Sequence, residues 1–314
     1  MRRLTLAVTF AAGAALAPAV ASAHETAVTP STAPSAWSFE PPVVVALLVA
    51  AALYALGVRA LWSRAGIGRG IAAWRAACFA LGLAVSAAAL ISPLDAMGHA
   101  LVSAHMTQHM LLTLVAAPLL VFGQPPRAFA WALPRGGRRA LRRAQRARGV
   151  PALGRTLTHP AVAWSLFAFS FWIWHVPGVY DAAVRHDALH AVEHATFVAG
   201  ALLFWWMAIE VAGRRRFDYG AAAVFVFTTM LQMSILAALL TFSERTWYGV
   251  YTAADTSPWH LTTLQDQQLA GLTMWMESNF VYFVAVAALI ALWLRDDERR
   301  VTRDAQPHRL AVAE

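Results

Sequence analysis

Apolar runs of about 20 residues, the length that a helix needs to cross a membrane, recur along most of this chain. Each run is bounded by proline, glycine or charged residues, which end helices or mark the membrane surface. The runs lie near residues 42–61, 72–91, 103–122, 160–178, 189–211, 220–242 and 269–294. The pattern predicts an all-α polytopic membrane protein, with a bundle of seven transmembrane helices over residues 42–294.

The N-terminal segment has a different pattern. Residues 1–23 carry two arginines, then an apolar stretch that ends in Ala21-Ser22-Ala23, which is typical of a cleavable signal peptide. Residues 24–41 are rich in threonine, serine and proline and predict a flexible extracytoplasmic tether. Residues 295–314 are polar and predict a cytoplasmic tail.

Composition and charge support this picture. The 314 residues are 59% hydrophobic and only 13% charged, which excludes a soluble domain of this size. All 25 basic residues are arginines, and most fall in alternate loops, which the positive-inside rule assigns to the cytoplasm. The N-terminus is therefore expected outside and the C-terminus inside. The arginine-rich segment 134–154 is expected to lie on anionic headgroups of the bilayer, and not on nucleic acid.

Candidate chemistry concentrates in two spans. His105 and His109 lie four residues apart at the start of the third span, and His190 and His194 repeat this spacing in the fifth. On a helix such a spacing puts both rings on one face. Ionisable side chains within a span are costly and mark functional sites. Imidazole is a ligand of copper, zinc and iron, so the two pairs predict a metal site just beneath the exterior surface, provided that the two helices are neighbours.

Four further residues are candidates in the same region. His175 ends the fourth span, and Glu193 stands beside His194, where it can orient a ligand imidazole or bind the metal itself. Met106 and Met110 can supply thioether ligands for copper(I), although they point about 100° away from the histidines on the same helix. Outside this region, Asp266 is suited to cap the seventh helix, and Glu277 lies within that span with no assigned role.

Four segments occur in order and in register with the spans: HMTQHMLL at 105–112, WHVPGVYDAA at 174–183, LHAVEHATFVAGALLFWW at 189–206 and DQQLAGLTMW at 266–275. Together they resemble the CtaG family of cytochrome c oxidase assembly membrane proteins, over roughly residues 45–294. The resemblance implies a bacterial plasma-membrane protein that is not an enzyme and that supplies copper during assembly of haem-copper oxidase. Its expected partners are the catalytic subunits of the oxidase and periplasmic copper chaperones.

The family's histidine motifs fall on His105, His109, His175, His190 and His194, with Glu193 beside them. Two other functions remain open on the residues alone. A membrane b-type cytochrome would ligate haem iron through histidines of two helices. A zinc-dependent intramembrane hydrolase would use metal-bound water as its nucleophile, with Glu193 or Asp181 as the base.

Overall fold

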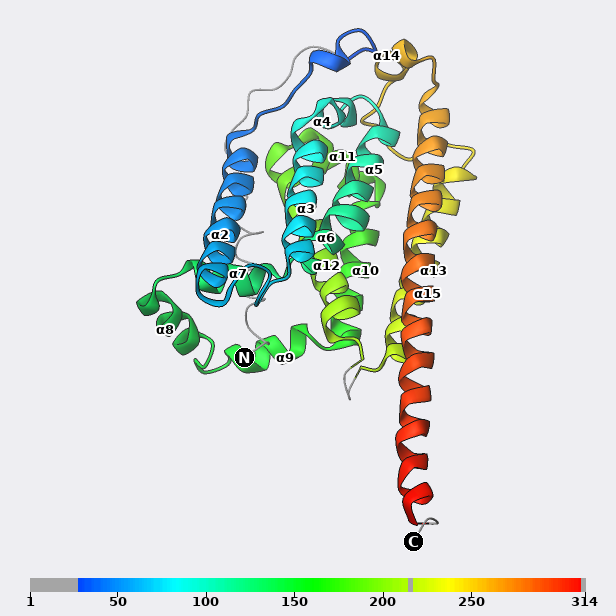
Figure 1. The fold of residues 1–314 in the computed structure, drawn as a ribbon. Coiled ribbons are helices and arrows are strands. Elements are labelled where there is room, and N and C mark those ends of the chain that lie inside the picture. Colours follow the sequence, from blue (N-terminus) through cyan, green and yellow to red (C-terminus); the bar gives the residue numbers. More distant parts are fainter. Residues whose placement is uncertain (1–27, 214–216, 312–314) are drawn as a thin grey trace.

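The structure, a computed structural model, describes residues 28–213 and 217–311, and its regular elements there are helices (Figure 1). This confirms the predicted all-α fold, while the predicted signal peptide lies outside the described residues. Six helical runs of the described chain are long and apolar enough to cross a membrane. They are α2 (Pro41–Ala65), α3 (Ala73–Ile91), Val102–Phe122, Asp187–Val211, α13 (Tyr219–Thr241) and α15 (Thr263–Ala311).

The expected fourth span is broken. It consists of α10 (Pro160–Trp174) and α11 (Pro177–Arg185), whose axes are bent by 78°. The break follows from Pro177, because a proline forces the residue before it, Val176, into an extended conformation. The spans number seven only if this bent pair crosses the membrane as one unit.

The third span is a continuous helix with a π-helical segment in its middle. It runs through α5 (Val102–Met110), the π segment η2 (Leu111–Ala116) and α6 (Ala117–Phe122). Pro118 has no N–H to donate to the preceding turn, and a π segment frees further carbonyl groups. One of these, the Thr113 carbonyl, accepts a 2.8 Å hydrogen bond from the Trp205 indole N–H of α12 (Asp187–Trp206). The bond ties the third span to the fifth.

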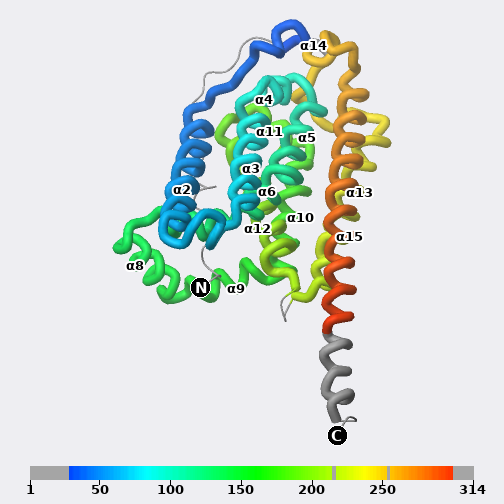
Figure 2. Tube along the Cα trace, viewed as in Figure 1, coloured from blue at the N-terminus to red at the C-terminus, as the bar shows by residue number. Residues whose placement is uncertain are grey.

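Short helices lie at both ends of the bundle. The end at which α5 and α12 begin, called the histidine end below, carries α4 and α14, while α7, α8 and α9 lie at the opposite end (Figures 1 and 2). α12 continues into a second π segment, η3 (Met207–Val211). The remaining short helices are η1 (Ala33–Ser35), α4 (Pro93–Gly98), α7 (Pro125–Ala132), α8 (Arg135–Ala144), α9 (Val150–Leu157), α14 (Ala253–Thr256) and η4 (Ser257–Trp259).

Two hydrophobic clusters hold the bundle together. The larger one joins the third span to α10, α12, α13 and α15, with Phe167, Phe204 and Tyr282 among its fully buried side chains. The smaller one joins α2 to α3 and α7, and includes Tyr54 stacked on Phe79. The larger cluster includes side chains of both α5 and α12, the two helices that bear the histidine pairs.

Candidate metal centre

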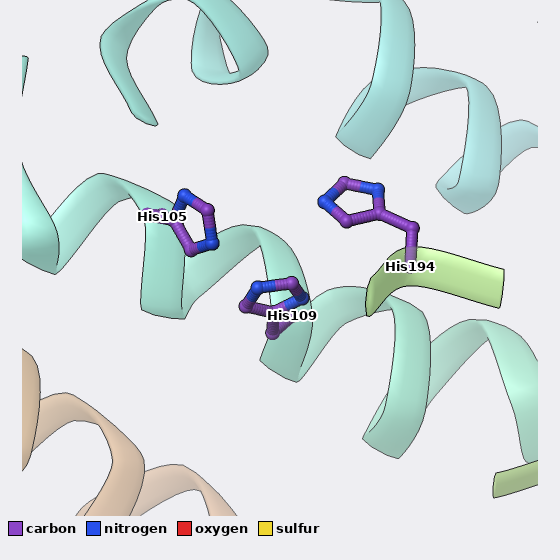
Figure 3. A group of neighbouring side chains, drawn as sticks. All are labelled: His105, His109 and His194. Atoms are coloured by element: carbon purple, nitrogen blue, oxygen red, sulfur yellow. The ribbon is translucent and has the colours of Figure 1, made fainter. Parts of the chain in front are cut away.

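Four imidazole rings, two from α5 and two from α12, gather at the histidine end of the bundle. The ring centroids of His105 and His109 are 4.4 Å apart on α5, and those of His190 and His194 are 4.3 Å apart on α12. Between the helices, His109 lies 4.9 Å from His194 and His105 lies 5.3 Å from His190. Figure 3 shows the rings of His105, His109 and His194 around a shared space. The two pairs thus form one cluster.

A carboxylate lies within this cluster. Glu193 is 1% exposed, and its Oε1 atom lies 3.4 Å from His109 Nε2 and 3.8 Å from His105 Nε2. An ionised carboxylate is costly to bury unless a positive charge lies close to it. Its position among imidazoles therefore favours a cationic occupant of the cluster.

Most polar atoms of the cluster have no hydrogen-bond partner within the described chain. Buried polar atoms in folded proteins are nearly always hydrogen-bonded, so such a concentration requires an explanation. An ion bound by these atoms supplies one, because ring nitrogens and carboxylate oxygens are metal ligands. The atoms are His105 Nε2, both ring nitrogens of His109, His190 Nε2, His194 Nε2 and Glu193 Oε2.

The ligand atoms fall into two overlapping groups of three. The first group is His105, His109 and His194, and the second is His105, His190 and Glu193. Within each group the ligand atoms lie within 4.8 Å of one another. Metal–imidazole bonds of about 2.0 Å place ligand atoms within about 4 Å of each other, so modest ring rotations would complete either group around an ion.

His175 lies outside both groups. Its Nδ1 is 2.7 Å from the Phe171 carbonyl oxygen, to which it can donate, and its Nε2 has no hydrogen-bond partner in the described chain. The ring of Phe197 lies 4.7 Å from His109 and 6.4 Å from His175, measured between centroids. His175 is therefore a neighbour of the cluster across an aromatic ring.

Met106 and Met110 belong to the large hydrophobic cluster, with exposed fractions of 1% and 2%. They follow the two histidines of α5 by one residue, which turns them toward the interior of the bundle. Both side chains pack among the apolar residues of that cluster, and their role as copper ligands stays a prediction.

The family model of the cytochrome c oxidase caa3 assembly factors matches residues 52–296, which include every helix that carries the cluster. The chain belongs to this family. The match confirms the resemblance drawn from the four sequence segments. Uncharacterized proteins of Mycobacterium bovis and Mycobacterium tuberculosis are each 29% identical to the chain over 280 residues, and one of Mycobacterium leprae is 27% identical.

The alignments with these three relatives cover 85% of this chain but 41% of each relative. The chain thus spans less than half the length of the curated relatives that it matches. No solved structure matches it.

Three tyrosines that sequence reasoning left without a role pack together beside the histidine cluster of this assembly-factor family member. Tyr180 is fully buried 5.3 Å from His105, stacks on Tyr248 and lies 3.0 Å from Tyr251 between hydroxyl oxygens. Tyr251 donates a 2.8 Å hydrogen bond to the Gly98 carbonyl. Burial raises the pKa of Tyr248 and of Tyr251, so both keep their hydroxyl protons at neutral pH. The signal that the sequence offered was a pair of tyrosines, Tyr248 and Tyr251, three residues apart in the loop that follows α13.

Asp266 was expected to cap the seventh helix, its own, but its side chain caps α5 instead. Its carboxylate accepts hydrogen bonds from the N–H groups of Val102, at 2.6 Å, and Ser103, at 3.2 Å. These groups belong to the first turn of α5, where backbone N–H groups have no partner within the helix. An acidic residue on α15 therefore holds the start of the helix that bears His105.

Two other polar residues of interest lie apart from the two groups of ligands. Glu277 is exposed on the outer face of α15. His99 is exposed in the connection between α4 and α5, and its ring lies 5.6 Å from that of His190. His24 is outside the described residues.

Proposed function

We propose that this protein takes part in the assembly of cytochrome c oxidase by holding copper in the histidine cluster of α5 and α12 and delivering it to the oxidase. Membership of the caa3 assembly factor family supports the assembly role. The buried ring nitrogens without hydrogen-bond partners support the metal role, and this single observation carries the proposal.

The energetics favour a bound cation. A buried polar atom without a partner costs about 1–3 kcal/mol, and the cluster concentrates several such atoms around one carboxylate. A cation that binds them would recover this cost and would balance the charge of Glu193. In the absence of such a ligand, selection for stability alone would favour apolar side chains at these positions.

Copper(I) suits the task of a delivery factor. Imidazole nitrogens bind copper well, and a site of a few histidines can lose its ligands one at a time to a competing set. Transfer by ligand exchange leaves the oxidation state of the ion unchanged and requires no nucleophile. The ion is therefore a cargo, and the catalytic subunits of the oxidase are the proposed recipients, with periplasmic copper chaperones as proposed donors.

The charge distribution supports an orientation with the histidine end outside the bacterial plasma membrane. The histidine end carries few arginines, whereas α8 at the opposite end carries five in the run RGGRRALRR. Cytoplasmic loops retain positive charge, so the C-terminus would face the cytoplasm.

The crowding of the rings argues against haem. A porphyrin held between two axial imidazoles would need the space that the other two rings occupy, since the neighbouring centroids lie 4.3–5.3 Å apart. The cluster fits a single ion of atomic size.

The test is metal analysis of the full-length protein purified in detergent and loaded anaerobically with copper(I). Wild-type protein should retain copper after desalting, and the variant His105→Ala plus His109→Ala should lose it. The matched control, Met106→Leu plus Met110→Leu, changes the same two turns of α5 and should retain copper. Equal copper in the wild type and the histidine variant would refute the site.

The assembly role is tested in cells. Deletion of the gene should lower oxidase activity and the copper content of the oxidase, and wild-type protein should restore both, whereas the double histidine variant should not. Normal oxidase in the deletion strain would refute the assembly role.

A further inference from the structure

We infer that the histidine cluster offers one copper ion two successive positions, a shallow one formed by His105, His190 and Glu193 and a deep one formed by His105, His109 and His194. His105 belongs to both and serves as the pivot of the transfer. This inference rests on the proposed function, and it adds the route by which the cargo enters and leaves.

The imidazoles by which the two groups differ lie about one helical turn apart along the bundle, with His190 in one group and His109 and His194 in the other. His190 precedes His194 by four residues on α12, and His105 precedes His109 by four on α5. Four residues of helix correspond to about 6 Å along the axis. Since His105 contributes a ligand atom to each group, this residue can bind the ion in both positions.

The shallow position is the nearer of the two to the surface, because it alone includes His190. His99 is exposed at the surface, with its ring 5.6 Å from that of His190. His190 is partly buried, whereas the two imidazoles that belong to the deep position alone, His194 and His109, are 8% and 1% exposed. This series of imidazoles leads from water to the interior, so the shallow position lies on the path of exchange with a donor or a recipient.

The two ligand sets differ in chemistry. The shallow position combines two imidazoles with the carboxylate of Glu193, a set that attracts cations and accepts divalent zinc as readily as copper. The deep position consists of three imidazoles and is less suited to hard cations. Glu193 Oε1 remains 3.4 Å from His109 Nε2, so its charge also stabilises an ion in the deep position.

The transfer is an exchange of ligands. The ion keeps its bond to His105, loses those to His190 and Glu193, and gains bonds to His109 and His194. Two bonds break and two form, neutral imidazoles replace a neutral imidazole and a carboxylate, and copper keeps its oxidation state. No co-reactant is required.

Single variants of the full-length protein separate the two positions. Copper(I) affinity is measured by competition with a coloured chelator, and the release rate by rapid mixing with excess chelator. His105→Ala removes both positions and should weaken binding at least about 100-fold. His109→Ala leaves the shallow position and should weaken binding about 10-fold with faster release.

His190→Ala leaves the deep position but removes the route to it. It should weaken copper binding less than His109→Ala does, while copper uptake and release slow at least about 10-fold. His186→Ala, an exposed histidine at the start of α12 outside both groups, is the matched control and should change neither quantity. His109→Asn and His190→Asn, which keep more of the polar side chain than alanine does, check that an effect does not reflect loss of folding. Each apo variant should elute as the wild type does in gel filtration.

Losses of affinity that are the same in His105→Ala, His109→Ala and His190→Ala would show a single cage and overturn the inference. Wild-type release from His190→Ala would also overturn it. In both cases wild-type copper binding, and with it the proposed function, would stand. Wild-type protein that binds no copper would refute both.

Discussion

The carboxylate of Asp266 accepts hydrogen bonds from the backbone N–H and the side-chain hydroxyl of Ser103, two residues before His105. The two residues are 163 positions apart in the sequence, on α15 and α5. A carboxylate at the start of a helix satisfies free N–H groups and interacts favourably with the helix dipole. Here it also holds α5 at one axial position and one rotation about its axis, which sets the orientation of the His105 and His109 rings.

Removal of this cap should affect both folding and the metal. Asp266→Ala is expected to lower the free energy of unfolding by about 1–2 kcal/mol, as for other lost caps, because two N–H groups of α5 lose their acceptor. Copper(I) affinity should fall about tenfold, because the α5 ligands are no longer held in place. Thermal unfolding and chelator competition measure the two effects.

A cap at the other end of the bundle provides the control for Asp266. Asp218 accepts a 2.7 Å hydrogen bond from the Ala221 N–H at the start of α13. Asp218→Ala should cost similar stability and leave copper affinity unchanged. Asp266→Asn, which keeps one acceptor oxygen, should recover part of both losses. An equal loss of copper affinity in Asp218→Ala would show that Asp266 acts only through global stability.

Gly271 allows a close approach of α15 to α13. A Cβ atom at this position would lie 2.8 Å from the Ala237 carbonyl oxygen and 2.7 Å from the Thr241 backbone nitrogen. Gly271→Ala should therefore separate the two helices and lower the free energy of unfolding by about 1–3 kcal/mol. Gly178→Ala is the control, because a Cβ there meets nothing within 4 Å and alanine favours the helix α11. Unchanged thermal stability in Gly271→Ala would contradict the packing argument.

The sequence predicted those features that depend on local pattern. Apolar runs located the spans, and the four-residue spacing identified the two histidine pairs, because a helix places such residues on one face whatever surrounds it. The interruption of the fourth span at Pro177 is also a local effect, because a proline restricts the conformation of the residue before it. The contact between the pairs could not be predicted, since it depends on how α5 and α12 pack.

Long-range contacts account for what the sequence left open. Aspartate is a residue type that caps helices, but only the packing of α15 against α5 decides which helix Asp266 caps. His175 stands in one of the family's histidine motifs, yet it belongs to neither group of ligand atoms. The position of Tyr251 likewise depends on a long-range contact, the hydrogen bond from its hydroxyl to the Gly98 carbonyl, 153 positions away in the sequence.

The Tyr251 hydroxyl should control how fast copper leaves. Tyr251→Phe removes the donor to the Gly98 carbonyl and the contact with the Tyr180 hydroxyl, which loosens the loop beside the cluster. Copper release to a chelator is expected to be several times faster, with a loss of about 1 kcal/mol in unfolding free energy. Tyr282→Phe is the matched control, because the buried Tyr282 hydroxyl has no hydrogen-bond partner in the described residues. Equal release rates in both variants would show that the loop does not limit release.

The orientation of the bundle can be tested with single cysteines in a Cys78→Ser background. His186→Cys places a thiol at the exposed start of α12, at the histidine end, and Arg139→Cys places one on the exposed face of α8, at the opposite end. A membrane-impermeant maleimide added to intact spheroplasts should label the first and should label the second only after the membrane is opened. The reason is that arginine-rich segments tend to remain in the cytoplasm, which would leave the histidine end outside, where the proposed function requires it. Labelling of Arg139→Cys in intact spheroplasts, with protection of His186→Cys, would reverse the orientation and place the cluster next to the cytoplasm.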